Sequence, residues 1–536
     1  MNQIQLDRAG TPKGFVPARR RLVAAGSLAV GATLALSTSA SAASFNVSNL
    51  SDAGPGSLRQ AVLDANANTG PDVVTFASGL SGTIKLTSGD INVNEALDIQ
   101  GPGAGVITVD ASNNFDGPND PARIFYASYF NLTGGGALSV SGLTLTGGRS
   151  DGTFRQPIYD NGGAIYAFDA DVVLANMVIS GNATTGNGSG GGVSTNQNLS
   201  IQSSTISGNS AAVSAGGFLV SSGTLTVKGS TISGNQATMN GGGAIMNPSL
   251  NAQRIENSTI ANNNAGNYGG AIDVKYSGAN PAEHLTVAAT TITGNGATTQ
   301  GGGIDSGPPA SQPTQLNDTI VANNNSPSGP DLFGPVGSAF SLIKSSSGAT
   351  ITDTVPGSNI IGADPQLGPL AANGGPTQTE APAGTSPAVD KGSAFGLGTD
   401  QRGVSRPIDF PSIPNSAAPG ADGSDIGAFE LQPSNAITLG KLQRKKKKGT
   451  AVQTVKVPLP DLGSLTLSGK GLKTQTRAVQ DNGIVKLKVI AKGKLRKALK
   501  RKGKAKVKET VTYNATAQSP NSIAKKIKLV KKRPQH

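Results

Sequence analysis

The chain has 536 residues, enough for several domains, and contains no cysteine and two histidines. This composition excludes disulfides, thiolate metal sites and cysteine nucleophiles, and leaves little material for histidine-based catalysis. The net charge of +13 is a cancellation, because residues 441–536 carry 28 basic and 3 acidic side chains whereas residues 43–440 carry 12 and 28. The overall charge therefore does not by itself indicate a nucleic-acid partner.

Residues 1–42 have the three parts of a secretory signal peptide. Arg19–Arg21 precede an apolar run at Leu22–Leu36, and Ala40–Ala42 offers a small-residue cleavage site. The apolar run is short for a bilayer span. We expect a protein that is secreted or held at the cell surface or wall, without a transmembrane span in the mature chain.

A short helix is predicted after the signal peptide. Ser57 and Gln60 have the spacing of a capping box. An apolar stripe at helical spacing follows, formed by Leu58, Ala61, Val62 and Ala65. Because an open solenoid end exposes its core, we expect residues 43–82 to cap the first coil.

An internal repeat dominates residues 160–325, with its clearest copies at Ser204–Asn209 and Ser230–Asn235. Three apolar columns recur, about 27 residues apart. The first column is Ile179, Ile206, Ile232, Ile260, Ile292 and Ile320. The second is Ile165, Val193, Leu219, Ile245, Ile272 and Ile304. The third is Leu174, Ile201, Val227, Ile255 and Val287, and Gln315 interrupts it.

This period, with three short strands per repeat, predicts a parallel β-helix in which each strand pairs with its counterpart in the next coil. The general preference for right-handed parallel crossovers predicts its handedness. Leucine-rich repeats are disfavoured because their dense leucine pattern is absent, and a propeller blade needs about 40 residues.

An asparagine follows each first-column residue at a spacing of three. These asparagines are Asn182, Asn209, Asn235, Asn263, Asn295 and Asn323. Asparagine suits turns, and stacked side-chain amides can bond along the coil axis. We interpret the set as a structural asparagine ladder.

Two groups of residues resemble a known family. The segment Gly56–Asn66 resembles the Cys-Ser-Leu-Arg-Glu-Ala capping segment of exported bacterial β-helix proteins, with Gly56 in place of cysteine and Gln60 in place of glutamate. Asp400–Gly403, Arg406-Pro407 and Asp425–Glu430 resemble the end of the choice-of-anchor Q family. The repeats are more loosely similar to those of polymorphic outer-membrane proteins. The resemblance covers about residues 45–430 and implies a pectin-lyase-like right-handed parallel β-helix, with no particular activity.

Composition changes after Pro433. Lys441–Lys448 holds six basic residues, and alternating segments follow in which apolar residues share one face and lysines the other. The strand-like segments are Thr454–Val457, Ser464–Leu467, Ile484–Ile490, Lys506–Tyr513 and Lys526–Val530, with a helical turn at Leu495–Leu499. They predict a small basic β-sandwich-like domain.

We therefore predict an all-β chain consisting of a right-handed parallel β-helix with an N-terminal capping helix and a small basic C-terminal domain. The predicted parts are a signal peptide (1–42), an N-terminal cap (43–82), the parallel β-helix (83–360), a C-terminal cap of the helix (361–432), a basic linker (433–450) and a Lys-rich β-sandwich-like domain (451–533).

Two carboxylates are the weak candidates for chemistry. Asp273 and Asp305 each follow a second-column residue, so we expect them on the outer surface, adjacent in the stack. A pair about 5 Å apart suits a retaining glycosidase, or could share a calcium ion. The insertion Lys275–His284 lies beside them and could form a cleft wall. The alternative is that both are structural surface residues. The Gly-His-Gly motif of β-helix polygalacturonases is absent.

We interpret the chain as a non-catalytic surface or wall protein for adhesion, surface display or glycan contact. The alternatives are a polysaccharide lyase or glycoside hydrolase that uses Asp273 and Asp305, and a passive structural spacer. Extracellular glycans or anionic wall polymers are the expected partners, and nucleic acid is not, because the basic tail has one aromatic residue, Tyr513. No cofactor is expected besides the calcium ion considered above.

Overall fold

The structure is a computed structural model. It describes residues 42–113, 122–128, 136–150, 160–247, 253–274, 284–307, 314–410, 413–457, 463–479, 483–515 and 519–532. Apart from its last position, the predicted signal peptide lies outside these residues, as do residues 275–283 of the insertion.

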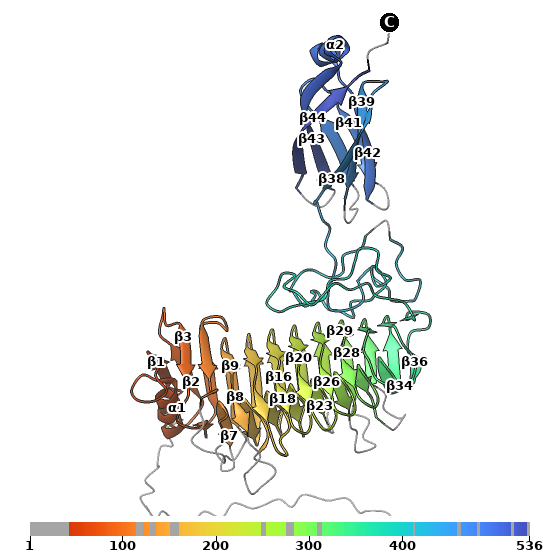
Figure 1. Cartoon of the computed structure of the whole chain (residues 1–536). Helices are drawn as coiled ribbons and strands as arrows, with labels where there is room; N and C mark the ends of the chain where they lie inside the picture. The colour runs from red at the N-terminus through yellow and green to blue at the C-terminus, as the bar shows by residue number, and fades with distance from the viewer. Residues whose placement is uncertain are drawn as a thin grey trace, which may run out of the picture. The chain divides into compact units, whose positions relative to one another are not determined.

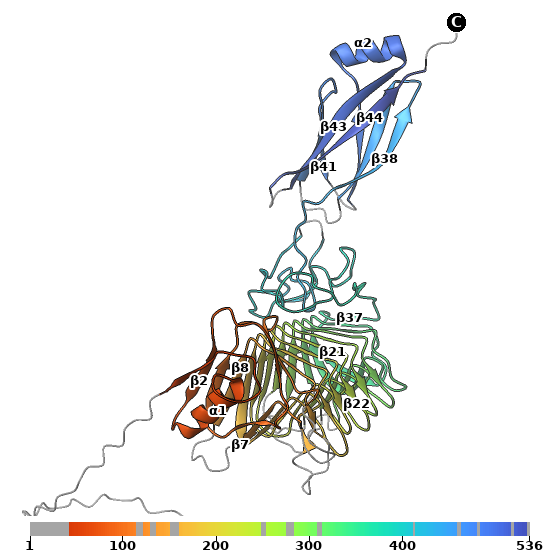
Figure 2. The ribbon, with the colours of Figure 1, turned by 60° about the vertical axis from the view of Figure 1, so that its left-hand side comes forward.

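The chain is all-β, and its first part consists of long parallel sheets in which strands stack in register, consistent with a β-helix-like solenoid (Figures 1 and 2). Ladder A contains β1 (Ser44–Val47), β2 (Asp72–Phe76), β5 (Leu97–Gln100), β8 (Gly136–Ser141), β12 (Ala170–Ala175), β16 (Leu199–Gln202), β20 (Leu225–Lys228), β24 (Gln253–Glu256), β28 (Leu285–Ala288), β32 (Thr314–Asn317), β34 (Leu332–Ala339) and β36 (Ala349–Asp353).

Ladder B contains β3 (Gly82–Lys85), β6 (Ile107–Asp110), β9 (Thr144–Thr146), β13 (Val178–Ser180), β17 (Thr205–Ser207), β21 (Thr231–Ser233), β25 (Thr259–Ala261), β29 (Thr291–Thr293), β33 (Ile320–Ala322), β35 (Leu342–Ile343) and β37 (Ile360–Ile361). Ladder C contains β4 (Ile91–Val93), β7 (Phe125–Ser128), β11 (Ile165–Phe168), β15 (Val193–Thr195), β19 (Phe218–Val220), β23 (Ile245–Asn247), β27 (Ile272–Val274) and β31 (Ile304–Asp305). Strand β34 pairs with both β31 and β32, so it joins ladders A and C.

A further ladder, D, was not anticipated from the sequence. It contains the two-residue strands β10 (Arg149–Ser150), β14 (Ala183–Thr184), β18 (Ser210–Ala211), β22 (Gln236–Ala237), β26 (Asn264–Ala265) and β30 (Gly296–Ala297). From β14 onward these strands follow the asparagine corner of their repeats, so hydrogen bonding between repeats continues beyond ladder B.

The apolar columns form one buried cluster, with two corrections to the predicted register. In ladder C the core residue of the β19 repeat is Phe218, which pairs with Val193 and Ile245, and the predicted Leu219 lies on the opposite face. In ladder B the residue that pairs with Ile292 is Val321, and the predicted Ile320 lies one position away. Adjacent apolar residues made both assignments ambiguous, because a one-residue shift reverses every side chain in a strand.

The asparagine side chains bond along the stack. Asn235, for example, accepts from the backbone N–H and the side-chain amide of Asn209, both at 3.0 Å. Its own amide donates to Ile206 O at 3.0 Å and to Asn263 Oδ1 at 2.9 Å. The same arrangement runs from Asn182 to Asn295 through buried residues, so these side chains satisfy corner backbone groups.

The last predicted member of this ladder is wrong by one residue. Asn324 accepts from Asn295, and its amide donates to Asp331 Oδ1, both at 2.9 Å. Asn323 instead has a φ of 61°, the left-handed conformation that Gly294 adopts in the preceding repeat. The whole repeat is shifted by one position, since Leu316 rather than Gln315 pairs with Val287.

A second polar ladder escaped the sequence analysis. The hydroxyl oxygens of Ser204, Ser230 and Ser258 accept backbone N–H groups from the preceding repeat, at 3.0 to 3.2 Å. The hydroxyl of Thr290 continues the series at 3.4 Å. Its signal was present in the repeated first residue of the Ser-Thr-Ile-Ser-Gly-Asn copies.

Helix α1 (Leu58–Ala67) forms where the apolar stripe predicted a helix, and all four stripe residues are buried. The Ser57 hydroxyl accepts from the Gln60 backbone N–H, but the Gln60 side chain donates to Asp64 instead of completing the capping box. Arg59 pairs with Asp52 at 2.8 Å and donates to the carbonyl of Asp90. These contacts hold the helix against the first coils.

Residues 437–532 have an apolar core of their own, enclosed by two antiparallel sheets. One sheet contains β38 (Thr438–Lys445), β39 (Thr450–Lys456) and β42 (Ile484–Val489), and the other β40 (Gly463–Ser468), β41 (Gln475–Val479), β43 (Lys504–Ala515) and β44 (Asn521–Val530), with helix α2 (Gly493–Lys502) between β42 and β43. The predicted linker at 433–450 is therefore partly wrong: Ile437, Leu439 and Leu442 pack into this core, and β38 pairs with β39. We call residues 437–532 the basic module.

The asparagine ladder gives the first prediction. Asn235→Ala removes a buried amide that donates to the Ile206 carbonyl and accepts from the Asn209 N–H, so we expect the free energy of unfolding to fall by about 3 kcal/mol. Thermal unfolding followed by circular dichroism measures the loss. Asn187→Ala, at an exposed position, is the matched control and should change stability little. Equal effects of the two substitutions would contradict a structural ladder.

Candidate functional site

Asp273 and Asp305 are brought together, as partners in the pairing of β27 with β31. They face away from the core column formed by Ile272 and Ile304. The expected exposure is wrong, because Asp273 is 1% and Asp305 4% exposed. Neighbouring residues of the same row are also buried, Tyr166 and Ser194 among them, so this row is covered.

The two carboxylates contact the glycine-rich corners of the repeats. Asp305 accepts from Gln300 Nε2 at 2.9 Å and from the backbone N–H of Gly307 at 3.0 Å. The Asp273 carboxylate lies directly against Gly241, where a β-carbon would be only 1.8 Å from its Oδ2 atom. Through these contacts, both aspartates form part of the packing and hydrogen bonding at the corners of the repeats.

Calcium binding would require more oxygen ligands than this pair supplies, since the ion takes six to eight. In the ranges that the structure describes, no group of three or more histidine, aspartate or glutamate side chains lies close enough to hold a metal ion. His284 precedes β28, and its carbonyl accepts from the Gln253 backbone N–H at 3.1 Å.

A larger cluster of charged side chains lies in residues 361–432. The fully buried Arg406 guanidinium pairs with Asp318 at 3.2 Å and with Glu430 at 2.9 Å. It also donates to the carbonyls of Asp425 and Gly427, at 3.0 and 2.6 Å. A single guanidinium thus joins Asp318, which lies between two strands of the solenoid, to the distant segment 425–430.

Arg402 extends this cluster. It pairs with Asp400 at 2.6 Å, and its guanidinium carbon lies 3.4 Å from the centre of the Phe429 ring. Asp400 also accepts from the Glu430 backbone N–H at 3.0 Å. The residues that carry the family resemblance near the end of the solenoid therefore meet in one buried network, whose contacts are structural.

Burial shifts the pKa values of the carboxyl groups in this cluster. It raises the pKa of Asp318 well above its ordinary value, and the adjacent Arg406 opposes that shift. It raises the pKa of Asp390 to about 7, while the backbone N–H of Phe410 opposes the change. Burial also raises the pKa values of Asp425 and Glu430. A carboxyl group whose folded-state pKa is raised contributes stability at low pH, and this contribution is lost as the pH rises through the raised pKa.

The same segment lies along the outer face of ladder B. The Thr291 hydroxyl accepts from the Ala428 backbone N–H at 3.1 Å, and the Thr259 hydroxyl donates to the Gln401 side chain at 2.6 Å. The Thr293 hydroxyl donates to Glu380 at 2.6 Å. These contacts correct the predicted end cap at 361–432: outward-facing threonines hold the segment against the side of the stack.

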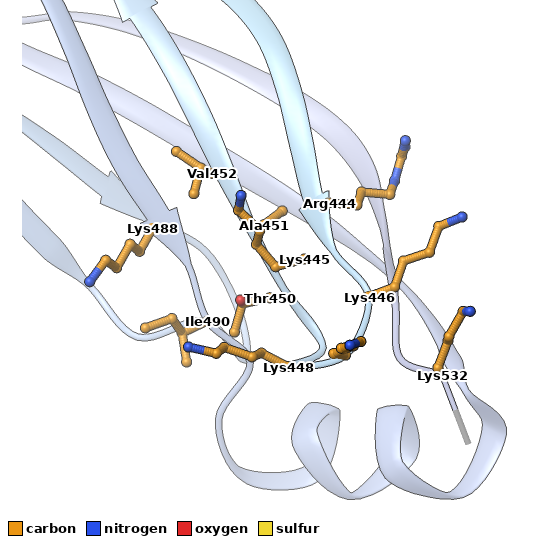
Figure 3. A pocket seen from close by; sticks show the side chains of 11 residues that line it. Arg444, Lys445, Lys446, Lys448, Thr450, Ala451, Val452, Lys488, Ile490 and Lys532 are labelled. Carbon is orange, nitrogen blue, oxygen red and sulfur yellow. The ribbon is translucent and has the colours of Figure 1, made fainter. Parts of the chain in front are cut away.

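The basic module presents the most concentrated charge. A hollow of about 820 Å³ is lined by Arg444, Lys446, Lys448, Lys488 and Lys532, together with neighbouring residues of the module. Figure 3 shows these side chains. Within the described part of residues 441–532, Glu509 is the one acidic residue. It is fully buried on the core face of β43, so the described surface of these residues carries no carboxylate.

Glu509 is itself unusual. Neither of its carboxylate oxygens has a hydrogen-bond partner, and burial raises its pKa to about 7 although Lys525, its cross-strand partner on β44, opposes the shift. A neutral Glu509 therefore suits the apolar core better than an ionised one.

No protein-family model, curated protein or solved structure matches the chain. No helix within the described ranges is long and apolar enough to cross a membrane.

The Arg406 network gives the second prediction. Arg406→Gln leaves Asp318 and Glu430 buried without their counter-ion, so we expect the free energy of unfolding to fall by about 3–5 kcal/mol. Denaturant titration measures it. Lys344→Gln is the control: its pair with Asp364 is exposed, so the loss should stay below about 1 kcal/mol. Equal losses would contradict a structural role for the buried network.

Glu509 gives a pH prediction. Its folded-state pKa lies above its ordinary value of 4.5, so its contribution is fully present below pH 4.5 and is lost as pH rises through about 7. Glu509→Gln stays neutral, and we expect it to stabilise β43 by up to about 3 kcal/mol at pH 8 and to change little at pH 4. Hydrogen–deuterium exchange of β43 measures this difference. The same effect at both pH values would show that ionisation of Glu509 is not responsible.

Proposed function

We propose that the chain is an exported protein of the bacterial cell surface or wall, acting without catalysis in adhesion, surface display or glycan contact. It is expected to belong to the choice-of-anchor Q type of exported β-helix proteins. In this proposal residues 1–42 direct export, and extracellular glycans or anionic wall polymers are the partners.

The proposal includes a finer architecture. The solenoid is a right-handed parallel β-helix with three main strands per coil, α1 closes its first coil, and the basic module is β-sandwich-like. The parallel ladders, the burial of the α1 stripe and the two antiparallel sheets of the module support this architecture.

One observation carries the functional proposal, namely the division of charge. Carboxylates such as Asp273, Asp305 and Asp318 are buried in corner and network contacts, whereas the basic module exposes lysines and arginines around its own core. Such a chain is suited to present a stable repetitive body while a separate part attaches electrostatically.

The contacts of Asp273 and Asp305 favour the non-catalytic interpretation over the lyase or hydrolase alternative. A retaining nucleophile must reach the sugar carbon that it attacks. Both side chains are almost fully buried, and Asp305 already accepts two hydrogen bonds from its own chain. A calcium ion held by the pair, and a passive spacer role, remain alternatives for the experiments below.

Localisation tests the proposal. Fractionating bacteria that produce the full chain should place it in the wall or medium without its first 42 residues. Retention in the cytoplasm with an intact N-terminus would overturn the proposal. Binding to a glycan array distinguishes adhesion from a passive spacer, because a spacer should bind none of the glycans.

Catalysis is tested separately. We expect the full chain to leave pectins and glucans uncleaved, with or without added calcium, because both candidate carboxylates are structural. Reducing-end release and product absorbance measure hydrolysis and elimination. Cleavage that Asp273→Asn abolishes, while the exposed-site control Asp364→Asn retains it and both variants keep a native circular dichroism spectrum, would establish the enzymatic alternative.

A further inference from the structure

Three hollows on the basic module are connected by shared residues. The hollow in Figure 3 shares Lys448, Thr450 and Ile490 with a hollow of about 290 Å³ beside α2. It shares Arg444 with another of about 680 Å³ over β43 and β44. We call the three together the cationic track.

Every charged residue in the described lining of the track is basic. Sixteen lysine and arginine residues line the three hollows, and their described lining includes no acidic or aromatic residue. Because Glu509 is buried, the described part of the module has no carboxylate with which these cations can form surface pairs. Their charge is thus available to a ligand.

Backbone contacts hold the parts of the track in place. Arg444 Nε donates to the Lys528 carbonyl at 2.9 Å, which links β38 to β44. The Lys532 N–H donates to the Lys446 carbonyl at 3.0 Å, and the Lys531 N–H to the Gly503 carbonyl at 2.8 Å. The turn after β38, the end of β44 and the end of α2 are therefore joined independently of any ligand.

We propose that the cationic track binds a linear phosphodiester polymer of the poly(polyol phosphate) type. A series of connected hollows suits an extended chain whose anionic groups recur, and lysine ammonium groups bind phosphates as point charges. The proposal rests on the surface location proposed above, where such a polymer would be encountered.

Two other anionic partners fit less well. Nucleic-acid strands are typically bound with aromatic side chains that stack on the bases, and the one aromatic residue of the module, Tyr513, is fully buried. Peripheral membrane binding gains much of its strength from apolar side chains inserted at the interface. The exposed large apolar residue found in the described module, Ile484, lines none of the three hollows.

The test compares two variants of the full chain that lose the same charge. The track variant replaces Lys446, Lys448, Lys488 and Lys532 by glutamine. The control variant replaces four exposed residues that line none of the hollows, namely Lys456, Lys470, Arg477 and Lys494. Binding to poly(glycerol phosphate) is measured by calorimetry across a salt series, with neutral dextran as a blank and circular dichroism to verify folding.

We expect the track variant to bind the polymer at least about tenfold more weakly, with a salt slope reduced by about 3, and the control variant to lose much less. Equal losses of affinity in the two variants would overturn the proposed binding site, because the polymer would then respond to the overall charge of the module and not to the track. Tighter binding to single-stranded thymidine oligonucleotide or to phosphatidylglycerol vesicles than to the polymer would also overturn it. If the protein is found in the cytoplasm while the polymer result holds, the surface location fails and the track does not.

Discussion

The in-register stacking of parallel strands is the constraint on which the solenoid depends. Each coil leaves backbone groups at its corners, and a buried corner must satisfy them without water. The Asn235 side chain does so by donating to the Ile206 carbonyl and accepting from the Asn209 side chain, both in the preceding repeat. The series ends at Asp331, whose carboxylate accepts from Asn324 and from the Ser345 backbone N–H and, unlike an amide, has no N–H that needs an acceptor.

This constraint explains how much of the fold was predictable. A period is a local property repeated along the chain, so the apolar columns, the asparagine position and the α1 stripe could be identified from residue types alone. The register of the last repeat could not be predicted in this way, because Asn323 and Asn324 are chemically identical and Ile320 and Val321 are both apolar. The position of Leu316 was the one discriminating signal, since it shifts by the same single residue.

The parts of the chain outside the repeats were less predictable, because no repeated pattern relates the residues that meet there. Arg406 meets Asp318 across 88 positions of sequence, and no repeat relates the two. The threonines of ladder B contact residues 361–432, and no repeated pattern in the sequence indicated that this segment covers them. Asp273 and Asp305 were placed in adjacent coils by the period, whereas their burial depends on what lies over the sheet, which the period does not describe.

The charged side chains of the chain act locally, and they act differently in the buried network and on the basic module. Carboxylates such as Asp318 and Glu430 are buried against Arg406, which compensates their negative charge within the network. The lysines of the basic module have no comparable partners in the described residues, and at physiological ionic strength a charge acts over roughly 8 Å. A ligand at the module therefore responds to the charge of the 441–532 surface that it touches. The net charge of +13 for the whole chain describes no surface that a partner meets.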